Sequence, residues 1–163
     1  MLTQEHRNNV ENRITELVKM ASEKFNRFNK EFKRPLIFFD VKGARGGFYR
    51  NGEIHLNPVL LVENGDEYIH QTVGHEFAHY VQRQIFPYSK PHGVEWKFCM
   101  RELGLEPVRC HSYDISNTTS RKRHIVVCNC QEHKVTMRII NKLRSGIRYR
   151  CRICSGNLVE KNS

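Results

Sequence analysis

The sequence contains no long apolar run. Its longest apolar stretches are residues 35–39 and 58–62, far shorter than the roughly 20 residues that cross a bilayer as a helix. The first twelve residues are polar and charged, and no apolar segment follows them, so the features of a signal peptide are lacking as well. We therefore expect a soluble, cytoplasmic protein with no membrane partner.

Acidic residues are scarce in the last third of the chain. Residues 109–163 hold 3 Asp and Glu against 12 Lys and Arg, whereas residues 1–108 hold 14 against 15, so the net charge of +10 falls almost wholly on the last third. Such a basic segment is typical of a surface that meets nucleic-acid phosphates, and we expect a nucleic acid as a partner there. A solubilising tail would show the same imbalance.

The pentapeptide His75-Glu76-Phe77-Ala78-His79 lies in a segment, 66–85, whose apolar residues recur every four positions. On a helix, residues four apart share a face, so both imidazoles can bind one metal ion. Glu76 stands where zinc hydrolases place the carboxylate that accepts a proton from water. The alternative is that two histidines merely lie on a polar helix face.

Catalytic zinc usually has three protein ligands and one open position. The next histidine is His92, before a second predicted helix over 95–103, and it is our candidate for the third ligand; Glu95 and Glu102 compete with it. The spacing fits other families poorly, because metzincins carry a third histidine where this chain has Ile85.

Three stretches of this chain resemble the SprT family, small bacterial relatives of the Spartan proteases that digest proteins crosslinked to DNA. They are residues 54–61 (Ile-His-Leu-Asn-Pro-Val-Leu-Leu), the pentapeptide at 75–79, and Pro91-His92-Gly93-Val94-Glu95-Trp96-Lys97. The C-terminal run 128–133 and the pair Cys151 and Cys154 match as well. The resemblance implies a zinc metallopeptidase in which His75, His79 and His92 hold the catalytic zinc and Glu76 is the catalytic base.

Four of the six cysteines form two pairs in the basic segment, Cys128-x-Cys130 and Cys151-x-x-Cys154. This pattern resembles a zinc ribbon with one shortened knuckle, and a segment so short needs a metal to hold it folded. We expect a second, structural zinc on the four cysteines. His133 is the alternative ligand, because a Cys-x-x-His knuckle could replace Cys128.

The remaining patterns predict the scaffold. Apolar residues from Val10 to Phe28 mark an amphipathic helix, residues 36–41 a strand, and Asn51-Gly52 the turn of a hairpin. His55 is either a sheet-surface or a cleft residue. Tyr68, Tyr80 and Tyr88 are candidate donors to the tetrahedral intermediate. The fold class is α+β, a zincin-like domain of helices and a small antiparallel sheet.

We therefore predict a metallopeptidase domain over 1–108, a linker over 109–120 and a basic zinc-ribbon module over 121–163. The expected function is zinc-dependent cleavage of protein substrates, associated with DNA and directed at DNA-bound or DNA-crosslinked proteins. Two other classes fit part of the sequence: a nucleic-acid-binding zinc protein without peptidase activity, and a metal hydrolase acting on a non-peptide substrate.

Overall fold

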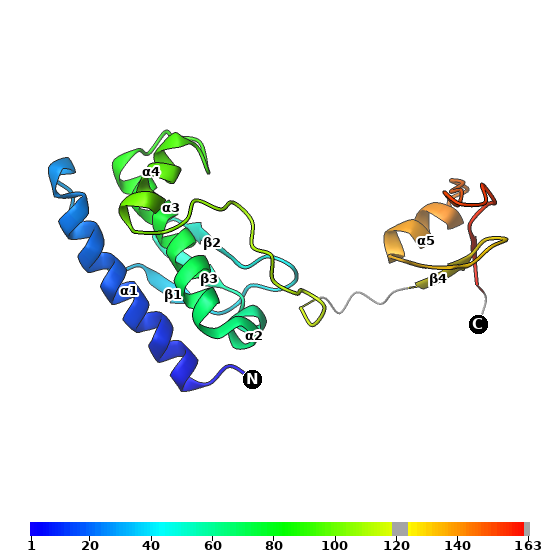
Figure 1. Cartoon of the computed structure of the whole chain (residues 1–163), viewed down its shortest axis with the longest axis horizontal. Helices are drawn as coiled ribbons and strands as arrows, with labels where there is room; N and C mark the ends of the chain where they lie inside the picture. Colours follow the sequence, from blue (N-terminus) through cyan, green and yellow to red (C-terminus); the bar gives the residue numbers. More distant parts are fainter. Residues whose placement is uncertain (119–123, 162–163) are drawn as a thin grey trace. The chain divides into compact units, whose positions relative to one another are not determined.

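The computed structural model describes residues 1–118 and 124–161. The chain divides into two compact units, Met1–Thr119 and Ser120–Ser163 (Figure 1). Both units combine helices with a small three-stranded sheet, so the protein is of the mixed α and β class. Within the described residues, no helix combines the length and the apolar character needed to cross a membrane.

The first unit begins with a long amphipathic helix, α1 (Gln4–Lys24), as the apolar periodicity predicts. Thr3 and His6 form a capping box at its start, which satisfies amide groups that the first turn leaves unpaired. Its apolar face is fully buried, and a short 3-10 turn, η1 (Asn26–Phe28), follows. The buried face consists of Val10, Ile14, Leu17 and Ala21.

The sheet of the first unit has the order β1-β3-β2, from β1 (Leu36–Phe38), β2 (Gly47–Arg50) and β3 (Glu53–Leu56). The predicted hairpin is confirmed: β2 and β3 pair antiparallel through Asn51 (φ 49°) and Gly52 (φ 89°). The expectation of a purely antiparallel sheet is wrong. The chain between β1 and β2 crosses the end of β3, which puts β3 in the centre and β1 parallel to it.

The helical segment that carries the His-Glu-x-x-His motif starts earlier than predicted. It consists of α2 (Pro58–Tyr68), a π-helical turn η2 (Ile69–Val73) and α3 (Gly74–Ile85). The Asn57 side chain caps α2 by accepting from the amides of the next turn, and Pro58 suits the first helical position. Gly65 (φ 45°, ψ −120°) is therefore a kink within this segment and not its beginning.

Helix α4 (Val94–Glu102) packs against α3, as expected for a second helix after the loop. Gly104 (φ 69°) ends it, and the following Leu105 turns back onto α3. A Cβ atom added to Gly74 would lie 2.6 Å from Leu105, so the two elements can approach this closely only at a glycine. The core between the helices holds the large buried side chains Phe25, Tyr68, Phe77, Trp96 and Met100.

Residues 109–118, which we expected in a linker between domains, belong to the first unit. His111 Nε2 lies 3.0 Å from the carbonyl oxygen of Ala44, and the hydroxyl of Tyr113 lies 3.0 Å from that of Thr72. Residues 109–118 therefore pack on the rest of the first unit, and we call them the strap. The Ser, Thr and Asn content of this segment predicted a linker. The contacts with distant residues leave no local pattern in the sequence that would have contradicted that prediction. The predicted boundaries at 120 and 121 lie outside the described residues.

The second unit is a sheet of order β5-β4-β6 with one helix. Its strands, β4 (His124–Val127), β5 (Glu132–Val135) and β6 (Val159–Glu160), are antiparallel, and α5 (Met137–Arg144) follows β5. Among the described residues only Val126, Ile140 and Cys151 are buried in this unit. Such a small core supports the expectation that a metal is needed to hold the unit folded.

Candidate metal centre and cleft

Helix α3 presents His75 and His79 on one face, while Phe77 and Val81 on the other face are fully buried in the core. The apolar contacts fix the rotation of the helix, because a turned helix would expose these side chains to water. The two histidines are half-buried and lie at the floor of a cleft. The helical spacing therefore places both imidazoles as the motif predicts.

His92 reaches the same point from the loop before α4. Its backbone has φ 57°, an uncommon value for a residue with a side chain. Its Nε2 atom lies 3.0 Å from Nε2 of His75 and 3.0 Å from Nε2 of His79. Among the described residues, these three histidines form a cluster whose ligand atoms lie within 4.8 Å of one another, and neither Glu95 nor Glu102 takes part.

A hydrogen bond at the far ring nitrogen fixes the tautomer of His79. His79 Nδ1 lies 3.2 Å from Oε1 of Gln82. Nδ1 of His79 then carries the proton and its Nε2 keeps its lone pair. Burial and, for His75, the neighbouring histidines lower the pKa of His75 to about 3 and of His79 to about 4, so both rings are neutral at pH 7.

A cation that accepts a lone pair from each of the three Nε2 atoms accounts for their convergence, so the cluster fits a metal ion. Tetrahedral zinc with bonds of about 2.05 Å to nitrogen would hold its ligands about 3.3 Å apart, close to the 3.0 Å separations of the cluster. The buried Trp96 backs the site, with ring centroids 4.7 to 5.4 Å from the three imidazoles. This apolar neighbour keeps the rings in place and limits water on that side.

Glu76 lies beside the histidines, only 6% exposed. Burial raises the pKa of its carboxyl to about 8, against the opposing influence of the Tyr49 amide and the charge of Arg45. It packs on the start of β2: a Cβ atom added to Gly47 would lie 3.1 Å from Cγ of Glu76 and 2.8 Å from the His55 carbonyl oxygen. Gly47 therefore lets the strand approach the carboxylate.

The cleft has a volume of about 1240 Å³. One wall is β2 with the preceding loop, the floor is α3, and the other wall is residues 106–113, which include the first part of the strap. Sequence reasoning missed Arg45, Tyr49 and Tyr113 as lining residues, because they come from a loop, a strand and the supposed linker. No local motif marks them.

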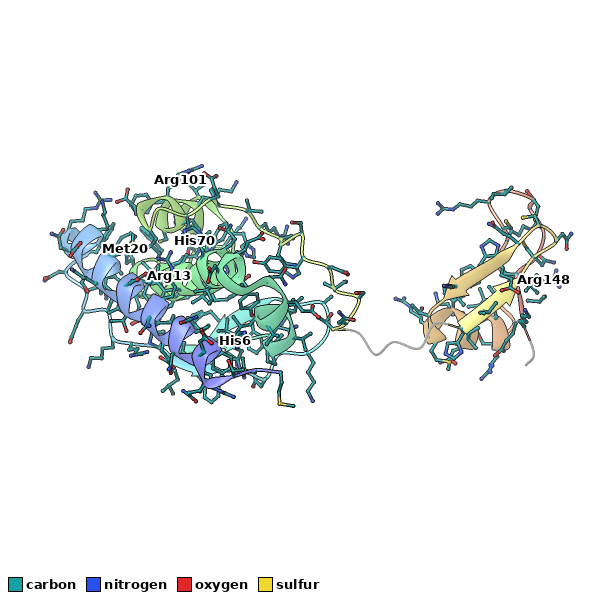
Figure 2. The ribbon with its side chains drawn as sticks, turned by 60° about the horizontal axis from the view of Figure 1, so that its bottom comes forward. His6, Arg13, Met20, His70, Arg101 and Arg148 are labelled. Atoms are coloured by element: carbon teal, nitrogen blue, oxygen red, sulfur yellow. The ribbon has the colours of Figure 1, made fainter. Side chains whose placement is uncertain are left out.

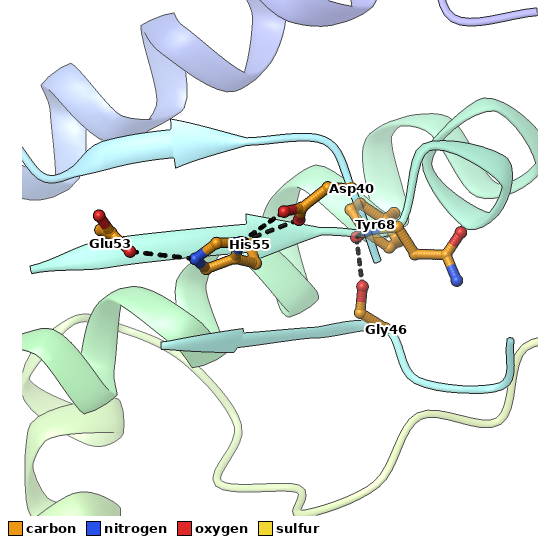
Figure 3. Close-up of polar contacts among 6 residues, drawn as sticks. Asp40, Gly46, Glu53, His55 and Tyr68 are labelled. Carbon is orange, nitrogen blue, oxygen red and sulfur yellow. Dashed lines mark hydrogen bonds and ion pairs between the residues drawn. The ribbon is translucent and has the colours of Figure 1, made fainter. Parts of the chain in front are cut away.

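The three tyrosines proposed as donors to the reaction do not line the cleft. Tyr68 is buried and donates to the Gly46 carbonyl at 2.7 Å, as Figure 3 shows. Tyr80 donates to the carbonyl of Lys33 at 2.8 Å, and Tyr88 is almost fully exposed. Tyr68 and Tyr80 thus hold the scaffold together. The expected role is unsupported because periodicity alone does not show where a ring points.

His55 is a sheet-surface residue. Its ring stacks between Phe38 and Phe48, at 4.9 and 4.4 Å between centroids. Nδ1 lies 2.9 Å from a carboxylate oxygen of Asp40, and Nε2 lies 3.3 Å from Glu53 (Figure 3). Both nitrogens are therefore engaged in the sheet, away from the three-histidine cluster.

The second unit brings together the other predicted ligands. The Sγ atoms of Cys128, Cys130, Cys151 and Cys154 lie within 4.8 Å of one another. The separations of 3.4 Å between Cys128 and Cys130 and 3.7 Å between Cys130 and Cys151 are too long for disulfides. They are near the roughly 3.8 Å of a tetrahedral zinc site with 2.3 Å bonds to sulfur. His133 Nε2 contacts Cys128 Sγ at 3.2 Å, at the edge of this group.

Comparison with known proteins identifies one family. The SprT-like family model matches residues 14–124. Protein SprT of Pasteurella multocida is 36% identical over 154 residues, covering 92% of this chain and 91% of that protein. Protein SprT of Pseudomonas paraeruginosa is 37% identical over 139 residues, covering 81% and 84%. No solved structure matches the chain. The extent of these matches shows that this chain belongs to the SprT-like family.

Proposed function

We propose that the first unit is a zinc-dependent endopeptidase. The observation that carries this proposal is the convergence of three imidazole nitrogens beside a buried carboxylate, inside a cleft bordered by an edge strand. His75, His79 and His92 would hold the zinc ion. A bound zinc supplies Lewis-acid chemistry, polarising a peptide carbonyl and making water more acidic.

Glu76 is the general base in this proposal. Its carboxylate takes the proton of the attacking water and later delivers it to the leaving amine. Burial favours the protonated carboxyl, while the Tyr49 amide and the charge of Arg45 oppose it, and a cation on the histidines would further favour the ionised form that can accept a proton. The close packing against Gly47 holds the carboxylate in place, so that little reorganisation is needed.

Strand β2 is the proposed binding site for the peptide. It is the last strand of its sheet, and in the described chain only β3 pairs with it. Gly47, Phe48 and Tyr49 of this strand line the cleft. An extended substrate could therefore add to the sheet through backbone hydrogen bonds, a mode that gives little side-chain specificity. A motif helix beside an edge strand is also the arrangement of a zincin-like domain.

We propose that the second unit holds a structural zinc and binds DNA. The four cysteines would be the zinc ligands, with His133 as the alternative for Cys128. Both glutamates in the described part of this unit are paired, Glu132 with Lys161 and Glu160 with Arg144. The other cations in the described part of this unit have no carboxylate partner there, which favours binding to phosphates. Binding to DNA would in turn direct cleavage to DNA-bound or DNA-crosslinked proteins.

A digestion assay tests the enzymatic proposal. Casein or histone would be incubated with the full chain and with Glu76→Gln, each with and without DNA. We expect the native chain to cleave these substrates and Glu76→Gln not to cleave them. Absence of cleavage by zinc-loaded native protein under all conditions would favour the second candidate, a nucleic-acid-binding zinc protein without peptidase activity, for which the basic second unit is the supporting observation.

A further inference from the structure

The segment that joins α5 to the second cysteine knuckle alternates between exposed arginines and inward residues. Arg148, Arg150 and Arg152 are exposed, whereas Tyr149 is half-buried and Cys151 is buried. Figure 2 labels Arg148 in this unit. The alternation means that Arg148 and Arg150 share one side of the segment, and Arg152 follows them. We call these three arginines the arginine row.

Backbone hydrogen bonds hold the row in place. The amide of Leu158 donates to the carbonyl of Tyr149 at 2.8 Å, and the amide of Cys151 donates to the carbonyl of Gly156 at 2.9 Å. An antiparallel bridge joins Arg150 to Asn157. Arg148 and Arg150 thus lie on extended backbone, about 6.6 Å apart at about 3.3 Å per residue, and Arg152 follows in the turn of the knuckle.

The row has no carboxylate partner in the described part of the chain. The two glutamates of the unit bind Arg144 and Lys161, at 2.6 and 2.5 Å. Three arginines this close along the chain repel one another, so a segment that holds them without a counter-charge favours an anion with repeated charges. One strand of a nucleic acid has such charges, at intervals of about 3.4 Å along the duplex axis.

A polar pocket of about 470 Å³ adjoins the row, with Arg150 in its wall. Asn129, Ser155 and Asn157 also line it, and no hydrogen bond joins their side chains to other described residues. A Cβ atom added to Gly156 would lie 3.3 Å from the Asn129 amide, so the glycine leaves room for that side chain. Amide and hydroxyl groups of this kind bind phosphate oxygens and sugars.

Resting on the proposed DNA-binding function of the second unit, we propose that the arginine row and the adjoining pocket are its contact surface for the sugar–phosphate backbone of one nucleic-acid strand. The arginines neutralise phosphates, and the pocket receives a phosphate or sugar group beside Arg150. The other exposed cations, such as Lys134 on β5 and Arg138 on α5, contribute only through the general field of the unit.

The experiment compares two double variants of the full chain that lose the same charge. Arg148→Gln with Arg150→Gln removes two members of the row, and Lys134→Gln with Arg138→Gln is the matched control. Binding to a labelled single-stranded oligonucleotide and to its duplex is measured by fluorescence anisotropy over a range of salt concentrations. Zinc content and circular dichroism show that each variant keeps its metal and fold.

We expect the row variant to lower the slope of log Kobs against log salt by about 1.4 on the single strand or about 1.8 on the duplex. The control should leave the slope nearly unchanged. Asn157→Ala should weaken binding without changing the slope, because it removes a neutral contact. Equal losses in both double variants would overturn this surface while leaving DNA binding intact. Absence of salt-sensitive binding by the native chain would overturn the DNA-binding proposal itself.

Discussion

Nδ1 of His79 lies 3.2 Å from Oε1 of Gln82, and Gln82 in turn links helix α3 to the loop that carries His92. Gln82 is fully buried, and its amide nitrogen donates to Oγ of Ser89 at 2.8 Å and to the carbonyl oxygen of Lys90 at 2.9 Å. One side chain therefore orients a proposed zinc ligand and fixes the loop just before another.

Gln82→Leu should weaken zinc binding by roughly 10- to 100-fold, since partners that orient a metal ligand have effects of that size. Competition with a chromophoric chelator measures the affinity. Gln82→Glu keeps an acceptor for His79 and should retain more zinc than the leucine variant. Gln84→Leu, on an exposed position of the same helix, is the control. Equal affinities in the two leucine variants would contradict the role of Gln82.

Glu76→Gln should keep zinc and fold but lose peptidase activity by roughly 100-fold or more, because the amide cannot accept the proton. Zinc content, circular dichroism and casein cleavage are the measurements. Glu95→Gln is a suitable control, since Glu95 lies next to Trp96 in the sequence but outside the histidine cluster. The proton-transfer mechanism would be wrong if Glu76→Gln cleaved casein at the native rate.

Each chain should bind two zinc ions, one per cluster. His75→Ala should lose one and keep both units folded, because the first unit has an extensive apolar core. Cys151→Ser should lose the other and loosen the second unit, whose core is small. Elemental analysis counts the ions, and limited proteolysis reports the loosening. A single ion in carefully reconstituted native protein would remove one of the two sites.

Gly47→Ala should lower the peptidase activity by a larger factor than it lowers the zinc content. The new Cβ atom would lie 2.8 Å from a backbone oxygen of His55 and 3.1 Å from Glu76 Cγ, so the strand or the carboxylate must move. Gly46→Ala is the comparison, because its Cβ atom would meet side-chain atoms of His111 and Thr72, at 3.1 and 3.3 Å. Side chains can adjust at lower cost than backbone. Activity unchanged in Gly47→Ala would show that close packing of β2 does not position Glu76.

Local patterns in the sequence predicted the parts of the site that depend on helix geometry. The four-residue spacing of His75 and His79 requires only a helix, and Asn51-Gly52 requires only a hairpin. His92 was harder, because it lies in a loop and has left-handed backbone itself, and the family resemblance supplied it. Contacts between segments that are distant in the sequence could not be predicted from it. The parallel pairing of β1 and the strap at Tyr113 depend on tertiary packing that leaves no periodic pattern.

A chain truncated after residue 119 separates the two proposed activities. The first unit ends there, and Asn117 still donates to Glu63 at 2.9 Å, so the strap and the cleft stay complete. Nearly all the net charge of the protein is removed, because residues 120–163 carry 11 basic and 2 acidic side chains. We expect the truncated chain to keep one zinc and the cleavage of free casein, but to lose salt-sensitive DNA binding.

Any stimulation of cleavage by DNA should be lost with the second unit, because DNA would act by raising the local concentration of substrates bound to the same strand. Anisotropy and cleavage assays with and without DNA measure both effects. Native DNA affinity in the truncated chain would place the nucleic-acid site on the first unit instead.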